Sequence, residues 1–279
     1  QVLPKGTSLF ARPFEGVSCE FRTCADLALP PLEVSSITTR PSAEAPVMYI
    51  DLDTLTEQPL RRMRCERLHF HLAGGNRNAL MLYQWLAVHL DKLYLHVGEH
   101  RFALPPLVTF IGFDPDEALL PSPGEQLDGY RVLQEFFCFP ERFHGFRIDG
   151  LQHVWPDEAA THVQLEFRFN APLPPDLRVD RTTVLLNCVP AINLFSRLAD
   201  PIALNGQTVS ELIRLSRQDG AQDEIFSVDR VSSLHQKSHR LVQDFKPFEA
   251  LDSRFPLAEP TPPRYYKLDI EQEPVNDKV

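Results

Sequence analysis

The chain has 279 residues and a formal net charge of −10, from 28 Lys and Arg against 38 Asp and Glu. This acidic balance argues against binding to nucleic acid or to an anionic membrane surface, and no stretch approaches the roughly 18 uninterrupted apolar residues of a membrane-spanning helix. High proline with low glycine, 25 against 12, predicts many stiff connections between short elements.

The first part of the chain alternates apolar and polar residues, which is the pattern of half-buried strands. Two runs, 17–24 and 67–72, each predict a strand with one buried and one wet face. Their apolar positions are Val17, Cys19 and Phe21 in the first run and Leu68, Phe70 and Leu72 in the second. Weaker patterns predict further strands at Leu32–Thr39 and Val47–Leu52.

His69 and His71 share one face of the second run, a spacing that can bind zinc or copper. A third ligand would have to come from elsewhere in the fold. The candidates are Glu66, His89, His96 and His100. Because both histidines fall opposite the apolar face, we interpret them as solvated side chains and predict no metal and no cofactor.

An apolar stripe predicts a helix from about Asn78 to Asp91. The stripe consists of Ala79, Leu82, Tyr83, Leu86 and Leu90. Either Asn76 or Asn78 could cap this helix by accepting a hydrogen bond from a backbone N–H of the first turn. A strand is expected after it, at Leu93–Val97.

The most informative segment runs from Gly112 to Phe143 and reads GFDPDEALLPSPGEQLDGYRVLQEFFCFPERF. Its aromatic side chains are Phe113, Tyr130, Phe136, Phe137, Phe139 and Phe143. Such a composition suits packing or docking better than bond breaking. We expect most of these rings to lie in a domain core, because small β domains need them inside. The alternative is an anchor for a partner protein.

A short helix is predicted within this segment, starting after Asp128 and ending before Pro140. Helical periodicity places Tyr130, Leu133 and Phe137 on one side of it. This side is therefore the expected packing face of the helix.

The carboxylates of the same segment are interpreted as structural groups. The run Asp114–Glu117 gathers proline and acidic residues where a turn or helix begins, and negative charge there favours the positive end of the backbone dipole. If Glu135 faces inward, it needs a partner such as Arg131 or Arg142. We therefore assign no catalytic residue.

Beyond this segment, strands are predicted at Phe146–Asp149, 162–169, Val184–Val189 and Leu212–Leu215. The run 162–169 has the clearest alternation. Its apolar face carries Val163, Leu165, Phe167 and Phe169, and its other face, expected to be wet, carries His162, Gln164, Glu166 and Arg168.

The run LNCVPAINLF, residues 186–195, predicts a strand that ends in a tight turn. Asn187 and Asn193 would hydrogen-bond within the turn, and Pro190 forbids a regular central strand. The cysteines are Cys19, Cys24, Cys65, Cys138 and Cys188, with no CxxC pair. We expect reduced thiols in a cytoplasmic protein, with Cys138 and Cys188 as small core residues.

These elements predict a mainly β (α+β) fold of two antiparallel sandwich- or barrel-like subdomains with two short helices. The expected division is a first β subdomain with one helix at 1–110, an aromatic connecting segment with a short helix at 111–150, a second β subdomain at 151–254, and a proline-rich linker with a polar tail at 255–279. Because the sequence reads as the middle of a domain from Gln1 onward, we expect a fragment of a longer protein.

Several of these segments, in this order, resemble the TssF family of baseplate subunits of the bacterial type VI secretion system. The most specific are Gly112–Phe143, residues 186–195 and EIFSVDRV at Glu224–Val231. Leu3–Val34, and Leu68–Gly75 followed by Leu82–Leu86, also match. The family's N-terminal helical region and its C-terminal region have no counterpart here, and the last thirty or so residues match weakly.

We interpret the residues that carry the family pattern as structural. They are Gly112, Phe113, Asp114, Leu119, Leu120, Pro121, Gly129, Tyr130, Leu133, Gln134, Glu135, Phe137, Phe139, Pro140, Phe143, Asn187, Cys188, Pro190, Asn193, Leu194 and Phe195. The resemblance implies a scaffold subunit of baseplate wedges that is not an enzyme. It implies TssG, TssK, TssE and a second TssF copy as partners, no nucleic acid, and no membrane insertion. Its location would be cytoplasmic, in a baseplate docked to the inner face of the envelope complex.

Two other functions stay open on the residues alone. A ligand-binding β-sandwich without catalysis, such as a carbohydrate module, would present a row of exposed aromatics on one sheet face, whereas the polar faces here carry His, Arg and Glu. A metal hydrolase built on His69 and His71 would hold stoichiometric zinc.

Overall fold

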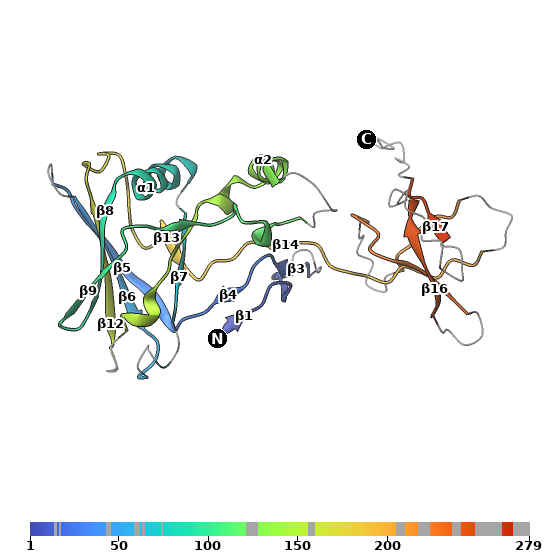
Figure 1. Ribbon diagram of the computed structural model, residues 1–279, viewed down its shortest axis with the longest axis horizontal. Coiled ribbons are helices and arrows are strands. Elements are labelled where there is room, and N and C mark those ends of the chain that lie inside the picture. Colours follow the sequence, from blue (N-terminus) through green and yellow to red (C-terminus); the bar gives the residue numbers. More distant parts are fainter. Residues whose placement is uncertain are drawn as a thin grey trace, which may run out of the picture. The chain divides into compact units, whose positions relative to one another are not determined.

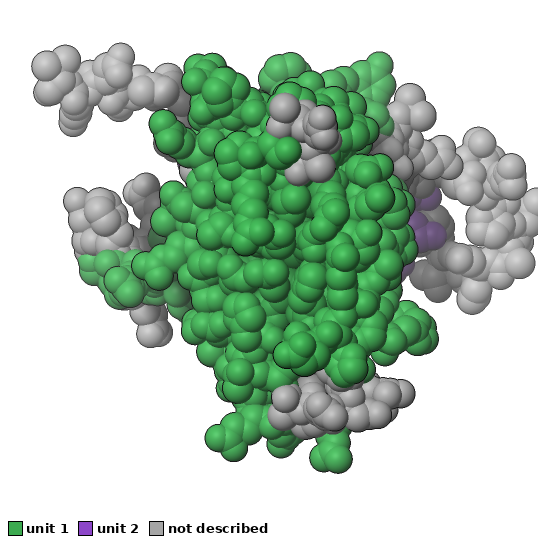
Figure 2. Space-filling view, turned by 90° about the vertical axis from the view of Figure 1, so that its left-hand side faces the viewer, with its two compact units in different colours: residues 1–196 green, residues 197–279 purple. Residues whose placement is uncertain are grey.

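The computed structural model describes residues 1–13, 16, 18–42, 46–58, 62, 65–73, 75–120, 128–155, 160–204, 210–216, 224–235, 241–248 and 264–269. By its internal contacts the chain divides into two compact units, Gln1–Ser196 and Arg197–Val279, which Figure 2 colours separately. The α-helices and the longest strands belong to the first unit (Figure 1).

The larger sheet of the first unit has five antiparallel strands in the order β5-β6-β12-β8-β9. Their bounds are β5 Leu32–Arg40, β6 Val47–Thr54, β12 His162–Phe169, β8 Leu90–Val97 and β9 His100–Leu104. Strand β12 lies at the centre, paired with β6 on one side and β8 on the other. Its apolar residues are all buried, which confirms the alternation predicted for 162–169.

A second antiparallel sheet has four strands in the order β10-β11-β7-β13. Their bounds are β10 Thr109–Phe110, β11 Gly145–Ile148, β7 Leu68–Leu72 and β13 Val184–Leu186. Helix α1, Asn76–Val88, buries Ala79, Leu82 and Leu86 in the core that these strands share. Strand β7 shows the predicted alternation, with Leu68, Phe70 and Leu72 buried.

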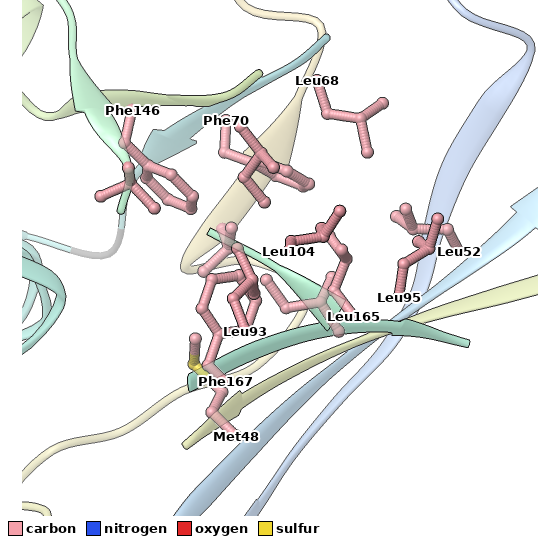
Figure 3. Close-up of a cluster of buried hydrophobic side chains, with 14 of the residues drawn as sticks. Met48, Leu52, Leu68, Phe70, Leu93, Leu95, Leu104, Phe146, Leu165 and Phe167 are labelled. Atoms are coloured by element: carbon pink, nitrogen blue, oxygen red, sulfur yellow. The ribbon is translucent and has the colours of Figure 1, made fainter. Parts of the chain in front are cut away.

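The main core lies between the two sheets. Phe70 and Phe146 come from neighbouring strands and stack with ring centroids 5.1 Å apart, and Phe146 meets Phe167 of the larger sheet edge-on at 6.4 Å. Figure 3 shows these side chains converging from both sheets, with Leu68 on one side and Leu93 on the other. The first unit is therefore a two-sheet sandwich, and its described strands form no closed barrel.

Two small antiparallel sheets complete the first unit. One pairs β1 Val2–Leu3 with β4 Leu27–Ala28, and the other has the order β14-β3-β2, with β14 Ala191–Ile192, β3 Glu20–Thr23 and β2 Ser8–Phe10. Strand β14 belongs to the run 186–195, so this run joins β13 in the sandwich to β3 near the start of the chain.

The second unit contains a three-stranded sheet in the order β15-β16-β17. The strands are β15 Val231–Leu234, β16 Leu241–Pro247 and β17 Arg264–Tyr266, of which β15 and β16 pair antiparallel and β16 and β17 pair parallel. Arg230 forms a two-point contact with Asp244 in this sheet, at 3.0 and 2.8 Å.

The mainly β class is confirmed, because the described residues form mostly antiparallel sheets and two α-helices. The strand predicted in 17–24 is shorter than expected and runs from Glu20 to Thr23. Its expected pattern of burial is wrong, because Cys19 is exposed while Thr23 and Cys24 are buried. Val17 lies outside the described residues. The strand predicted at Leu212–Leu215 is wrong, since residues 210–216 form no regular element.

The first predicted helix is shifted towards the start of the chain. It ends at Val88, and Leu90 and Asp91 already belong to β8. Its N-cap is Gly75, with no side-chain bond, so the predicted Asn cap is wrong. The Asn78 amide instead donates to the Arg178 carbonyl at 2.5 Å and accepts from the Arg178 N–H at 2.9 Å, which fixes a distant loop.

The boundary between the two compact units lies between Ser196 and Arg197. The expected limits at 110/111 and 150/151 lie within the first unit, where β12 pairs with β6 and β8. The expected linker at 255–263 lies outside the described residues. Among the described helices, none is long and apolar enough to span a bilayer.

Candidate interaction surface

The Gly112–Leu120 segment forms a tight turn that leads towards helix α2, Asp128–Cys138. A short 3-10 helix, η2 Pro115–Glu117, is capped by Asp114, whose Oδ1 accepts from the Asp116 N–H at 3.0 Å. The acidic residues therefore lie where a short helix begins, as the sequence indicates, and Asp114 in addition caps it. Lys5 Nζ also donates to the Asp116 carbonyl at 2.6 Å, so the start of the chain helps to hold the turn.

Beneath α2 lies a buried charge network centred on Glu135, which is 2 % exposed. One carboxylate oxygen accepts from Arg131 Nη1 at 3.1 Å and forms an ion pair with Arg142, and the other accepts from the Leu119 N–H at 2.9 Å. Both arginines proposed from the sequence are therefore partners of Glu135. The network is a structural brace, as interpreted from the sequence, because it ties α2 to the turn before it and to the residues after it.

The two arginines also bind backbone carbonyls of the Gly112–Leu120 turn. Arg131 Nη2 donates to the Phe113 carbonyl at 3.2 Å, and Arg142 Nη2 donates to the Glu117 carbonyl. Burial, together with the charge of Arg131, lowers the pKa of Arg142 to about 10, so Arg142 stays charged at neutral pH. Two cations thus share one buried anion and backbone oxygens, which makes the carboxylate of Glu135 indispensable to the local balance of charge.

Gly112 is required by the close packing of this turn. Its φ is +106°, a conformation that disfavours L side chains, and a Cβ added there would lie 2.9 Å from Cδ1 of Phe143. Its N–H donates to a carboxylate oxygen of Glu117 at 2.5 Å. The position predicted as a family-pattern glycine therefore has a steric reason to be glycine.

With Arg131 and Glu135 directed inward, the aromatic side of α2 faces outward. Tyr130 is 70 % and Phe137 81 % exposed, and Leu133 is also exposed. Phe113, Phe136 and Phe139 are exposed too, and of the six aromatics of this segment only Phe143 is buried. The expectation that most of these rings fill a core is wrong, because the interior beneath α2 is occupied by the charge network.

Three of the exposed rings, those of Phe113, Phe136 and Phe137, are held in place by contacts with other rings. Phe143 packs against Phe113 and Phe136, with ring centroids 5.1 and 5.9 Å apart, and Phe136 meets Phe137 nearly edge-on at 5.9 Å. We call this set, together with Tyr130, Leu133 and Phe139, the aromatic face. A helix with its charged residues inside and its apolar residues outside reverses the usual surface pattern and is typical of a binding surface.

An apolar hollow of about 350 Å³ adjoins the end of α2. Its lining is Leu119, Leu120, Glu135, Cys138, Phe139, Ala191 and Ile192. The hollow therefore lies where the Gly112–Phe143 segment meets β14 of the run 186–195. Sequence reasoning singled out both segments, but gave no indication that they meet.

The run 186–195 is less regular than predicted. Asn187 adopts a φ of +61° and its N–H donates to the His69 carbonyl at 3.1 Å, so the chain turns sharply after β13. Among the described residues its Oδ1 has no hydrogen-bond partner, and Asn193 is exposed, so the expected bonding of both amides within the turn is not found. The Pro190 carbonyl accepts from the Cys24 N–H at 2.9 Å, which ties this run to β3.

The remaining family-pattern residues are spread around these features. Leu119 is buried; Leu120, Pro140, Leu194 and Phe195 are half-buried; Gly129, Gln134 and Cys188 are exposed; Pro121 lies outside the described residues. Pro140 begins a 3-10 helix, η3 Pro140–Phe143, directly after α2, which confirms the predicted helix end. A further 3-10 helix, η4 Leu151–His153, follows β11.

The histidine pair on β7 is not solvated as expected. Both rings are half-buried, and burial lowers the pKa of His69 to about 4 and lowers that of His71. The described residues contain no group of three or more His, Cys, Asp or Glu that could hold a metal ion. The pair is therefore not supplied with a third ligand in this part of the chain.

The wet face predicted for β12 also contains a buried group. Glu166 is almost fully buried among His96 at 2.6 Å, Arg101 at 3.3 Å and Arg168. Although burial opposes ionisation, hydrogen bonds from Arg168 and His96 hold the pKa of Glu166 below its usual value. The guanidinium of Arg101 also stacks on the ring of Tyr94, 3.6 Å from its centre, so Arg101 lies over both Glu166 and Tyr94. Figure 2 views the first unit from the side of the larger sheet, which lies at the left of Figure 1.

The cysteines divide into two groups. Cys24 and Cys65 are buried, and burial raises the pKa of both, that of Cys65 to about 12. Cys19, Cys138 and Cys188 are exposed, so the expected core positions of Cys138 and Cys188 are wrong. The aromatic neighbours of Cys138 suggested a core, but those neighbours themselves face outward.

Comparisons with known proteins agree on one relationship. Residues 1–278 match the family described as "Type VI secretion system, TssF". The type VI secretion system component TssF1 of Pseudomonas aeruginosa is 27 % identical over 272 residues, covering 89 % of this chain and 43 % of the relative. A chain of the TssK-TssF-TssG baseplate subcomplex, solved by cryo-electron microscopy, is similar with a TM-score of 0.76 and 29 % identity, over 85 % of this chain and 46 % of that one. The chain thus spans less than half the length of these relatives.

Proposed function

Because the chain belongs to the TssF family of the type VI secretion system, we propose that it is a structural scaffold subunit of the baseplate, which assembles wedges through protein–protein contacts and performs no catalysis. The observation that carries this proposal is the aromatic face of α2. Exposed rings on a helix that is braced from beneath form a preorganised docking surface.

The size of the aromatic face supports this role. A fully buried aromatic side chain covers 150–250 Å², so the exposed parts of Phe113, Tyr130, Phe136, Phe137 and Phe139 offer roughly 600 Å². That is at the upper end for the largest apolar patch of a monomer, about 300–600 Å², and approaches the roughly 800 Å² that each partner contributes to a standard interface. Aromatic residues are also enriched among those that dominate binding energy.

The proposed partners follow from the family. The similar solved structure is a complex of TssK, TssF and TssG, so we propose TssG and TssK as direct partners, with TssE and a second TssF copy in the same wedge. We propose no contact with nucleic acid and no membrane insertion. The proposed location is cytoplasmic, in a baseplate docked to the inner face of the envelope complex.

The proposal is tested by co-purification of this protein with TssG and TssK from the same secretion system. We expect wild-type protein to bind at least one of them, and Tyr130→Ser with Phe137→Ser to weaken binding at least tenfold. Both side chains project outward, so the double variant should fold normally. The matched control is Val88→Ser with Leu107→Ser, which changes two exposed apolar residues outside the aromatic face.

No association of the wild-type protein with either partner would contradict the proposed function.

The position of the aromatic rings argues against the carbohydrate-module alternative, because they cluster on a helix and not in a row on a sheet face. Tyr49 and Tyr94, on the larger sheet, lie under Arg40 and Arg101 instead.

A further inference from the structure

We propose that the aromatic face and the adjoining hollow receive a segment of a partner protein that inserts one bulky apolar side chain into the hollow and places Lys or Arg against the acidic Asp114–Glu117 turn. This inference rests on the proposed scaffold function and names the chemistry of the segment that docks there.

The hollow has the features of an anchor site. Its volume of about 350 Å³ is within the range of pockets that hold small ligands, about 300–1,000 Å³. Leu119, Ile192 and Phe139 give it apolar walls, and the one charged group in its lining, Glu135, is already paired with two arginines. A buried apolar side chain therefore fits it better than a polar one.

The charge at the edge of the aromatic face is negative on balance, because Lys5, which donates from Nζ to the Asp116 carbonyl, offsets only part of the charge of the acidic turn. Asp114 directly follows Phe113, and both Asp114 and Asp116 are exposed. The cations nearest in sequence, Arg131 and Arg142, are buried and directed at Glu135 and backbone carbonyls, so they present no positive charge at the surface. A partner with a basic rim would gain affinity and a faster encounter from this arrangement.

The same charge disfavours two other occupants. A second copy of this chain would bring an identical acidic turn to a two-fold interface, and the net charge of −10 adds to that repulsion. An anionic membrane surface would be repelled for the same reason. A basic, apolar segment of another protein is therefore the occupant that both the hollow and the charge favour.

Cys138 provides a native reporter, because it lines the hollow and is exposed. The experiment measures alkylation of each cysteine by iodoacetamide, read by mass spectrometry, in the protein alone and with purified TssG or TssK. We expect the partner to slow alkylation of Cys138 at least tenfold. Cys19, which is exposed but does not line the hollow, should react at the same rate with and without partner, whereas Cys24 and Cys65 should stay unreactive throughout.

Two variants separate the hollow from the charge. Cys138→Trp fills the hollow and should weaken binding at least tenfold, whereas Cys138→Ala should bind as the wild type does. Asp114→Asn with Asp116→Lys removes the negative charge while Asn keeps an acceptor for the cap, and it should weaken binding at least tenfold. Wild-type binding should also weaken as salt rises, and the charge variant should lose that dependence.

The outcomes distinguish the two proposals. If neither TssG nor TssK binds the wild-type protein, the scaffold function fails. If one binds but leaves Cys138 as reactive as before, or binds both variants unchanged, the docking proposal alone is overturned. Slow alkylation of Cys138 without any partner, protection by dimerisation of the protein at high concentration, or protection by anionic phosphatidylserine vesicles would also overturn it.

Discussion

Substitution of Glu135 by Ala should strongly destabilise the first unit, because it removes the buried carboxylate that pairs with both Arg131 and Arg142. Breaking a buried ion pair by removing one partner costs about 3–5 kcal/mol, and loss of the acceptor for the Leu119 N–H adds about 1–3 kcal/mol. Glu135 also lines the open hollow, so water can enter the vacated space and hydrate the arginines. We therefore expect a loss of about 3 kcal/mol, at the lower end of the range.

The assay is urea unfolding of wild type and variant, followed by the fluorescence of Trp85 and Trp155, which both pack in the core of the first unit. Trp155 is buried and donates from its Nε1 to the Cys65 carbonyl. The midpoint should fall while the slope stays unchanged, since the exposed surface on unfolding is the same. Glu135→Gln keeps an acceptor for Leu119 and should lie between wild type and the Ala variant.

A triple variant provides the compensating control. Replacing Arg131 and Arg142 by Met together with Glu135→Leu removes every charge of the network at similar volume, and such replacements are often neutral. We expect it to be more stable than Glu135→Ala but about 1–3 kcal/mol less stable than the wild type, because the Leu119 N–H still loses its acceptor. If Glu135→Ala alone costs less than about 1 kcal/mol, the buried network is not the brace described for α2.

The other predictions concern stability and use the same unfolding assay. Gly112→Ala should cost about 1–3 kcal/mol, because its Cβ would enter the Phe143 ring at a positive φ; an unchanged midpoint would show that the turn can relax. The folded-state pKa of His69, about 4, lies below its unfolded value of 6.5, so the unfolded state binds the proton first and stability falls as pH drops from about 6.5 to about 4, by about 3 kcal/mol. His69→Gln should flatten that part of the pH profile, and an equally steep profile would place the effect on other groups. Phe146→Ala should cost about 3–5 kcal/mol and Phe137→Ala less than about 0.5 kcal/mol, and equal losses would mean that the aromatic face is not exposed.

The strands of the sandwich were predictable because a period of two is visible within each strand. In β12 and β7 the buried residues alternate as the sequence indicates, and no knowledge of neighbouring strands is needed. The end of α2 was also predictable, since Pro140 restricts the residue before it. These features depend on local chemistry.

The direction of the aromatic face was not predictable from periodicity. A helical period shows that Tyr130 and Phe137 share a side, but not whether anything covers that side. The available signal was the spacing of Arg131 and Glu135, which places opposite charges on one helix face as an i, i+4 pair. Read together with Arg142, this pair could have indicated a buried polar side and an outward apolar one.

Burial of Glu166 was missed for a related reason. Alternation correctly placed Glu166 on the side of β12 opposite its apolar residues. Glu166 is nevertheless buried, because His96 of β8 and Arg101 of β9 lie against it. Which side chains gather across strands depends on sheet order, and the order β12-β8-β9 is not encoded in any single strand. The meeting of the Gly112–Phe143 segment with β14 at the hollow was hidden in the same way.

The central claim is that the aromatic face of α2 contacts another baseplate subunit. Incorporating the photo-crosslinker p-benzoylphenylalanine at Phe137, the most exposed ring of this face, tests it most directly in a reconstituted mixture with TssG and TssK. The account predicts a crosslink to one of these proteins from position 137 and none from the exposed Leu107, substituted in the same way. An assembled complex without a crosslink from position 137, or with equal yields from both positions, would contradict it.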